Sequence, residues 1–223
     1  MRFLTLSRAG AVVMLTAGAV PADAWAQFGI AGRASTLGIG AEVSYRASRN
    51  VGLRAGGNWL RFTRDGTVDE IDYEVTPRLQ NATVLLDISP FGGAFHLTGG
   101  LIVNDNEGHL DALLNQPIQI GENTYSPQQV GSLIGTVTFD DLAPYAGLGF
   151  AGSGAVSFLF DLGVAFSGRP RATLVGNTSL TGTEKAIFDA NVAQEQAALQ
   201  AEIDDRDYLK YHPVISIGIR IRL

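Results

Sequence analysis

The chain ends in a segment, Tyr208 to Leu223, in which apolar and polar residues alternate with a period of two. Successive side chains of a β-strand point to opposite faces, so this alternation predicts a strand with one apolar and one polar face. Ile215 and Ile219 lie on the apolar face, and Arg220 lies on the other. An apolar exterior and a charged interior are typical of the wall of a transmembrane β-barrel.

The same pattern recurs along the chain and predicts eight strands. The segment around Leu162 is the most regular after the last one, so we expect Leu162→Arg to be costly and Gly163→Ser, on the opposite face, to be mild. The first segment is weakly patterned and is counted separately because an even number keeps both termini on one side of a membrane. The predicted strands are 28–34, 37–46, 51–63, 73–88, 94–104, 137–150, 156–167 and 208–223.

The connections between these strands alternate between short and long. The short ones are 47–50, 89–93 and 151–154, and the long ones are 64–72, 105–136 and 168–207. Outer-membrane barrels keep short turns on the periplasmic side and long loops outside. Aromatic residues fall near both ends of the predicted strands, as two membrane girdles require, whereas a soluble β-sandwich, the alternative fold, gathers its rings in one core.

The long loops contain predicted structure of their own. Residues 117–125 indicate a small hairpin, and Ser126 and Pro127 indicate a helix start. A longer helix is predicted over 184–205, entered through Thr181 with capping-box spacing. It is expected to pack across the barrel mouth or against the second long loop, with docking of a partner as the alternative. The fold prediction is all-β: an eight-stranded antiparallel up-and-down transmembrane β-barrel with a helix in the last extracellular loop.

The N-terminal residues predict export. Arg2 and Arg8 precede the apolar run 9–20 and the small-x-small sequence Ala24-Trp25-Ala26. This order is typical of a cleaved signal peptide, and the run is too short for a membrane-spanning anchor, the alternative. The predicted division is a signal peptide over 1–26 and an outer-membrane barrel over 27–223, located in the bacterial outer membrane.

Composition excludes several classes. The formal net charge of −6 is unsuited to nucleic-acid binding. The absence of cysteine excludes a disulfide scaffold and thiolate metal sites. The 27 glycines suit a small, strongly curved barrel, since glycine marks bends and crowded positions in strands.

The inward faces of the predicted strands carry charges that we expect to pair. An eight-stranded barrel has an interior just wide enough to be filled by side chains, and a buried charge is costly unless it is paired. A lumen filled by a polar network is therefore predicted, with a narrow porin-like channel for small or hydrophobic solutes as the alternative. Asp87 and His96 are expected to be cross-strand neighbours. The predicted network is Glu42, Arg46, Arg54, Asp87, His96, Asp161, Lys210, Arg220 and Arg222.

Candidate catalytic chemistry is sparse. The three histidines form no HExxH motif, and no GxSxG motif is present. The acidic residues of 65–72 lack the ligand spacing and the glycine of a calcium loop. We predict no catalytic residue, no cofactor and no metal site. An outer-membrane lipid-modifying enzyme that uses His96, with Asp87 as its acid, is kept as a third function.

Several motifs resemble known barrel proteins. Ser216, Gly218, Ile221 and Leu223 are similar to the C-terminal assembly signal of bacterial outer-membrane proteins. The chain as a whole resembles small barrels of the OmpA/OmpX type. The stretches 36–40, 90–93, 129–133 and 143–149 look like a group of proteobacterial barrel proteins without assigned activity.

This resemblance implies fold and location and carries over no ligand residues. The predicted function is a non-enzymatic outer-membrane protein with a structural or surface-interaction role. Its expected partners are outer-membrane lipid and lipopolysaccharide, the barrel-assembly machinery, and an extracellular ligand or protein that contacts the loops.

Overall fold

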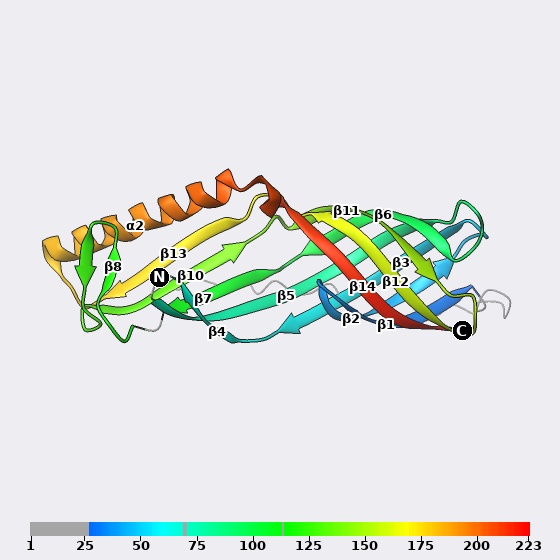
Figure 1. Ribbon diagram of the computed structural model, residues 1–223, viewed down its shortest axis with the longest axis horizontal. Helices are drawn as coiled ribbons and strands as arrows, with labels where there is room; N and C mark the ends of the chain where they lie inside the picture. Colours follow the sequence, from blue (N-terminus) through cyan, green and yellow to red (C-terminus); the bar gives the residue numbers. More distant parts are fainter. Residues whose placement is uncertain (1–26, 69–70, 113) are drawn as a thin grey trace, which may run out of the picture.

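Eight strands pair in a closed antiparallel ring, as the sequence predicts. The computed structural model describes residues 27–68, 71–112 and 114–223, so the predicted signal peptide lies outside the described residues. The first and last strands pair with each other, with Gly29 opposite Arg222, and so close the barrel (Figure 1). The barrel strands are β1 (Phe28–Ser35), β2 (Gly38–Arg46), β3 (Val51–Arg61), β5 (Ile71–Ile88), β6 (Phe95–Asn104), β11 (Leu142–Ala151), β12 (Val156–Phe166) and β14 (Tyr211–Arg222).

Two predicted strand boundaries are wrong. The sixth barrel strand begins at Leu142, whereas residues 137–138 belong to a separate strand, β10 (Val130–Thr138), outside the barrel. The last strand begins at Tyr211, after a short 3-10 helix, η1 (Asp207–Lys210). In both cases the alternation in the sequence begins several residues before the barrel strand does.

The three long connections form a continuation of the barrel sheet rather than loops. It comprises β4 (Arg64–Val68), the first half of β5, β7 (Glu107–Ala112), β10 and β13 (Arg171–Thr178), paired in that order. Together with α2 (Gly182–Asp205) and a small hairpin, β8 (Ile118–Ile120) and β9 (Asn123–Tyr125), we call this part the extension. The end of the barrel from which it projects is the extended end, and the opposite end is the turn end (Figure 1).

The hairpin and the long helix are confirmed, but the helix expected at Ser126 is wrong. Ser126 begins a single turn in which its carbonyl accepts from the backbone N–H groups of Gln129 and Val130. α2 starts after Thr181, whose side chain makes no capping hydrogen bond. The helix packs along β13 and against the hairpin, so it contacts the second long connection, one of its two expected locations. Its Phe188 is fully buried at the centre of an apolar cluster.

Glutamines of α2 bind the free edge of β13. Gln196 Oε1 accepts from the N–H of Leu174 at 3.0 Å, and Gln200 Oε1 accepts from the N–H of Ala172 at 2.9 Å. Gln200 also donates to the carbonyl of Pro170. An unpaired strand edge is a template for pairing with another chain. The two side chains occupy part of that edge and satisfy the N–H groups of Ala172 and Leu174.

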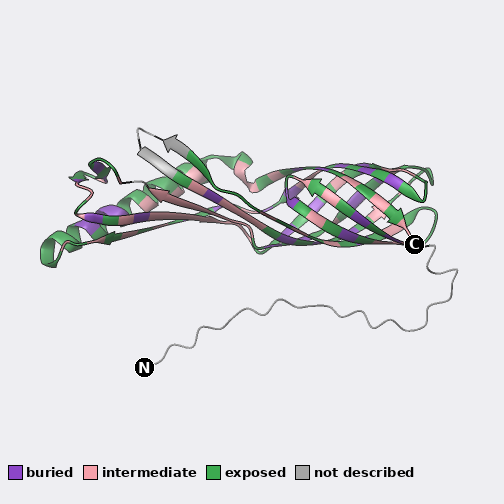
Figure 2. Ribbon diagram, turned by 90° about the horizontal axis from the view of Figure 1, so that it is seen from below, coloured by how far each residue is buried: buried purple, intermediate pink, exposed green. Residues whose placement is uncertain are grey.

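The outer face of the barrel is apolar along its whole length. Burial alternates along the barrel strands, as Figure 2 shows, so that Phe158 is 80% exposed beside the buried Leu159. Aromatic rings gather at both ends: Phe95 and Phe150 pack with tilted rings at the turn end, and Phe166 and Tyr211 pack edge to face at the extended end. Among the described residues, no helix is long and apolar enough to cross a membrane.

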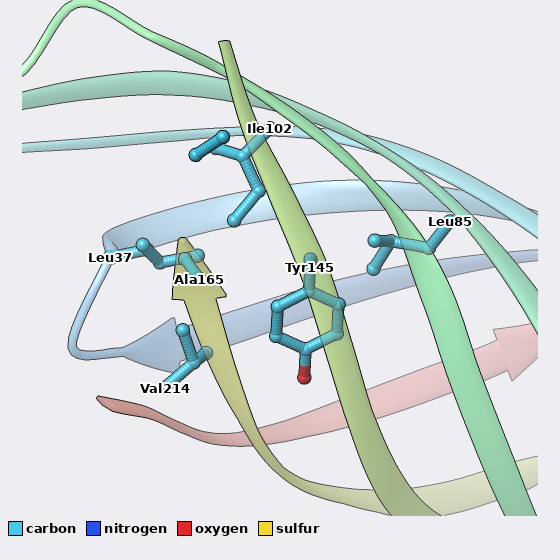
Figure 3. Packing of buried hydrophobic residues seen from close by; sticks show 7 residues of the cluster. Leu37, Leu85, Ile102, Tyr145, Ala165 and Val214 are labelled. Atoms are coloured by element: carbon cyan, nitrogen blue, oxygen red, sulfur yellow. The ribbon is translucent and has the colours of Figure 1, made fainter. Parts of the chain in front are cut away.

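An apolar layer crosses the lumen near the extended end (Figure 3). The alternation in the sequence does not predict this layer. In the predicted strand 37–46, Leu37 shares the apolar face of Ile39, which would place it outside, and this placement is wrong. Leu37 lies in the tight turn between β1 and β2, where strand alternation does not apply, and it is only 7% exposed. The layer consists of Leu37, Leu85, Ile102, Ala143, Tyr145, Ala165 and Val214.

Candidate functional site: the barrel lumen

Arg54 connects carboxylates from three other strands. Its Nε lies 2.7 Å from Asp87 Oδ2, and its Nη2 lies 2.8 Å from Asp87 Oδ1. The same Nη2 is 3.2 Å from Asp161 Oδ1, and Nη1 is 3.4 Å from Glu42 Oε2. The Arg54 side chain is 7% exposed. Because the partners lie on β2, β5 and β12, this guanidinium joins strands from opposite sides of the bore.

Arg33, on β1, completes the cluster and is absent from the network predicted from the sequence. Its Nη1 donates to both oxygens of Glu42, at 3.1 and 3.2 Å, and its Nη2 pairs with Asp161. Its Nε donates to Ser216 Oγ at 3.0 Å. Arg33 lies two residues after the buried Ala31, so strict alternation in the weakly patterned first strand would have placed it inside.

His96 lies in the same layer. Its Nε2 is 3.0 Å from Asp161 Oδ1 and 4.0 Å from Asp87 Oδ1. The residue directly opposite Asp87 is Thr98, which donates to it at 2.7 Å, so His96 and Asp87 are diagonal neighbours. The other ring nitrogen of His96 faces the carbonyl of Ala94 at 3.4 Å. Both ring nitrogens therefore face acceptor oxygens within the described part of the chain.

The remaining residues of the expected network lie elsewhere. Arg46, Arg220 and Arg222 lie around the turn end, where Arg220 Nη2 donates to the carbonyl of Gly152 at 2.7 Å. Lys210 was expected in the lumen, and the structure contradicts this: it belongs to η1, before the strand begins, and its Nζ lies 2.7 Å from Asp207 Oδ1. The alternation in the sequence begins at Tyr208, three residues before the strand itself, and so gives Lys210 the parity of an inward residue.

The four residues of the expected assembly signal all lie on β14 or directly after it. Ser216 is buried and accepts the hydrogen bond from Arg33. A Cβ on Gly218 would lie 2.6 Å from the carbonyl oxygen of Gly32, so this position has room only for glycine. Ile221 and Leu223 are exposed on the outer face. Packing therefore explains the two inward positions, and recognition by assembly machinery stays a prediction.

Two small cavities lie on either side of the Arg54 guanidinium. One of about 80 Å³ is at the turn end, and one of about 40 Å³ lies between the charged layer and the apolar layer. In the described residues, no group of three potential metal ligands has the geometry to hold an ion. The lumen thus contains a charged layer and an apolar layer in series, each formed by side chains from several strands.

Comparison with known proteins identifies the fold. No family model matches the chain, and no curated protein matches it. The crystal structure of CarO2 from Acinetobacter baumannii aligns with a TM-score of 0.60 and 22% identity, covering 88% of this chain and 98% of that one. CarO from the same organism aligns with a TM-score of 0.58 and 21% identity, covering 87% and 97%. The expected likeness to small outer-membrane barrels is confirmed: the chain has the fold of CarO, an eight-stranded outer-membrane barrel.

Proposed function

We propose that this protein is an integral outer-membrane protein whose closed barrel holds the extension at the cell surface as a platform for interaction. The observation that carries the proposal is the set of contacts between Arg54 and Glu42, Asp87 and Asp161, which fill the bore from several sides. In this arrangement the turn end faces the periplasm, and the predicted signal peptide directs export.

The charged layer favours a closed lumen over a narrow channel. A hydrated ion would have to separate buried pairs, and breaking such a pair costs about 3–5 kcal/mol because it leaves an uncompensated charge. The apolar layer around Tyr145 then offers no polar ligands to a passing ion. The two layers act in series, so that opening one leaves the other in place.

The contacts of His96 give no support to a lipid-modifying enzyme. A serine hydrolase needs a serine hydroxyl hydrogen-bonded to the histidine. In the described residues, His96 contacts Asp161 and the Ala94 carbonyl instead. Its side chain is 6% exposed and faces the lumen, whereas lipid lies against the outer face.

The extension provides the surface for interaction. α2 exposes acidic residues such as Glu202 and Asp189, each also paired to a basic neighbour one turn away. We propose an extracellular ligand or protein as the partner of this surface, with lipid and lipopolysaccharide around the barrel and the assembly machinery as the partner of β14 during insertion.

Location and permeability test the proposal together. The protein should sediment with outer membranes, resist SDS until it is boiled, and lose α2 to protease added to intact cells. Purified protein in planar bilayers should show no stable conductance, and Arg54→Ala should lower thermal stability without opening a current. Reproducible single-channel steps whose ion selectivity changes in Arg54→Ala, but not in the surface variant Arg206→Ala, would overturn the closed lumen.

A further inference from the structure

The cavity at the turn end is surrounded by arginines that have no acidic partner. Arg46, Arg220 and Arg222 line it, and none of them forms an ion pair with a carboxylate in the described part of the chain. The one carboxylate in its lining belongs to Asp87, which is engaged by Arg54 at 2.7 Å. This cavity therefore combines several positive charges with little local compensation.

The surrounding turns add no negative charge. The connections that close this end, residues 47–50, 89–94 and 152–155, contain no aspartate or glutamate, and the first contributes Arg49 to the cavity. The whole chain nevertheless has a net charge of −6. The positive charge at the turn end is thus a local feature, and low-dielectric walls around a cavity strengthen the field that it produces.

The Arg220 side chain is held in place by packing and by a hydrogen bond. Gly29 leaves room for the stem of Arg220, because a Cβ there would lie 3.1 Å from Arg220 Cδ. Arg220 is also held by its bond to the Gly152 carbonyl. Nη2 of Arg222 is shielded from solvent and has no hydrogen-bond partner among the described residues. A shielded donor without an acceptor costs free energy, which a bound anion would recover.

We propose that this cavity is a binding site for a phosphate-type oxyanion, with Arg46, Arg220 and Arg222 as its ligands. Guanidinium groups present paired N–H donors that match tetrahedral oxyanions, and three of them favour a multiply charged phosphate over a carboxylate. The cavity of about 80 Å³ suits a group of this size. Binding in the cavity does not depend on the orientation of the barrel in a membrane.

Calorimetry with inorganic phosphate tests the site on the full chain in an uncharged detergent. Saturable binding is expected, and sodium chloride at equal ionic strength should not reproduce it. Arg46→Gln and Arg222→Gln should each weaken phosphate binding by about tenfold, as expected for losing a charge-assisted hydrogen bond. Arg206→Gln removes a charge at the extended end and should leave the affinity unchanged. Heat released without saturation, or equal binding by all variants, would refute the site.

Arginine-specific modification of the unaltered protein gives a second readout that needs no variant to fold. Phosphate should slow the reaction of phenylglyoxal with Arg46 and Arg222, followed by mass spectrometry, and should not slow it at Arg206. Equal rates with and without phosphate would again overturn the proposal. Phosphatidylglycerol in phosphatidylcholine nanodiscs then identifies the source: competition with phosphate indicates a lipid headgroup, and undiminished phosphate binding indicates a free anion.

Discussion

Arg54 and Asp161 meet inside the barrel, with Nη2 3.2 Å from Oδ1, although 107 residues separate them in the chain. Each also contacts a second partner of opposite charge: Arg54 contacts Asp87, and Asp161 contacts Arg33. The ion pairs therefore form one connected network, and removing one member leaves several others without compensation.

Arg54→Ala should lower the free energy of unfolding by about 3–5 kcal/mol, because it leaves buried carboxylates unpaired. Equilibrium urea unfolding in liposomes measures this. Arg206→Ala, which removes an exposed arginine paired within one helix, should cost far less. Equal losses in the two variants would show that the lumen pairs contribute no more than surface pairs.

The lipid-facing side of β12 should not tolerate a charge. Leu162→Arg is expected to cost about 2–4 kcal/mol near the centre of the membrane. The matched lumen variant is Gly52→Ser, since a Cβ at Gly52 would meet nothing closer than 3.7 Å. Folding yields and unfolding free energies in liposomes compare the two. A similar cost for both would contradict the assignment of faces.

Gly163 does not serve as the mild lumen variant that the sequence suggests. A Cβ there would lie 2.4 Å from Tyr145 Oη and 2.7 Å from the carbonyl oxygen of Ala146, and that carbonyl is backbone. Gly163→Ala should therefore lower the unfolding midpoint, whereas Gly32→Ala, with open space around the added carbon, should not. Equal urea midpoints for Gly163→Ala and Gly32→Ala would show that β11 and β12 can move apart at Gly163.

The sequence predicts the faces of the barrel strands better than the contacts across the bore. The alternation of apolar and polar residues places Glu42, Arg54 and Asp87 inside, because lipid requires an apolar outer face on every barrel strand. The alternation does not predict which inward charges contact one another across the bore, since those contacts depend on the stagger of neighbouring strands and on the curvature of the barrel. The inward Tyr145 and Val214 also interrupt the polar face, where the lumen is filled by apolar packing instead.

The extension is the part of the fold that the sequence predicts least well. Its strands have no lipid on one side, so they carry no strong alternation, and every residue of β7 is half-buried. The pattern of residues 105–136 therefore predicts a long connection without barrel strands. The hairpin and α2 are predicted because turn residues and a helical stripe are local signals, and the strand predicted over 73–88 already includes part of β5 in the extension.

Asp207 should titrate below the ordinary range of an aspartate. Its pKa is lowered first by the hydrogen bond and the charge of Lys210, with a smaller contribution from Arg169. Lys210→Met should raise the pKa, as followed by carboxyl NMR, and Arg169→Gln should raise it less. Because the pKa of Asp207 is lower in the folded than in the unfolded protein, its pairing with Lys210 contributes to stability above the unfolded pKa. That contribution is lost as the pH falls through the folded pKa. An unchanged pKa in Lys210→Met would refute the assigned cause.

The edge of β13 should depend on the two glutamines of α2. Gln196→Ala with Gln200→Ala should speed hydrogen exchange at the N–H groups of Leu174 and Ala172, which lose their acceptors. Gln194→Ala, an exposed change on the same helix, is the control. Unchanged exchange at both amides would show that the glutamines do not protect the edge.

The continuity of β5 determines how the protein responds to mechanical force. This strand has 18 residues and spans roughly 60 Å, more than twice the apolar height of a barrel wall of about 25 Å. It passes from the barrel into the extension without a hinge, pairing with β3 and β6 in one part and with β4 and β7 in the other. Tension along β5 would load many ladder hydrogen bonds at once in shear. The extension should therefore bear pulling by a bound surface or by flow without pivoting on its base.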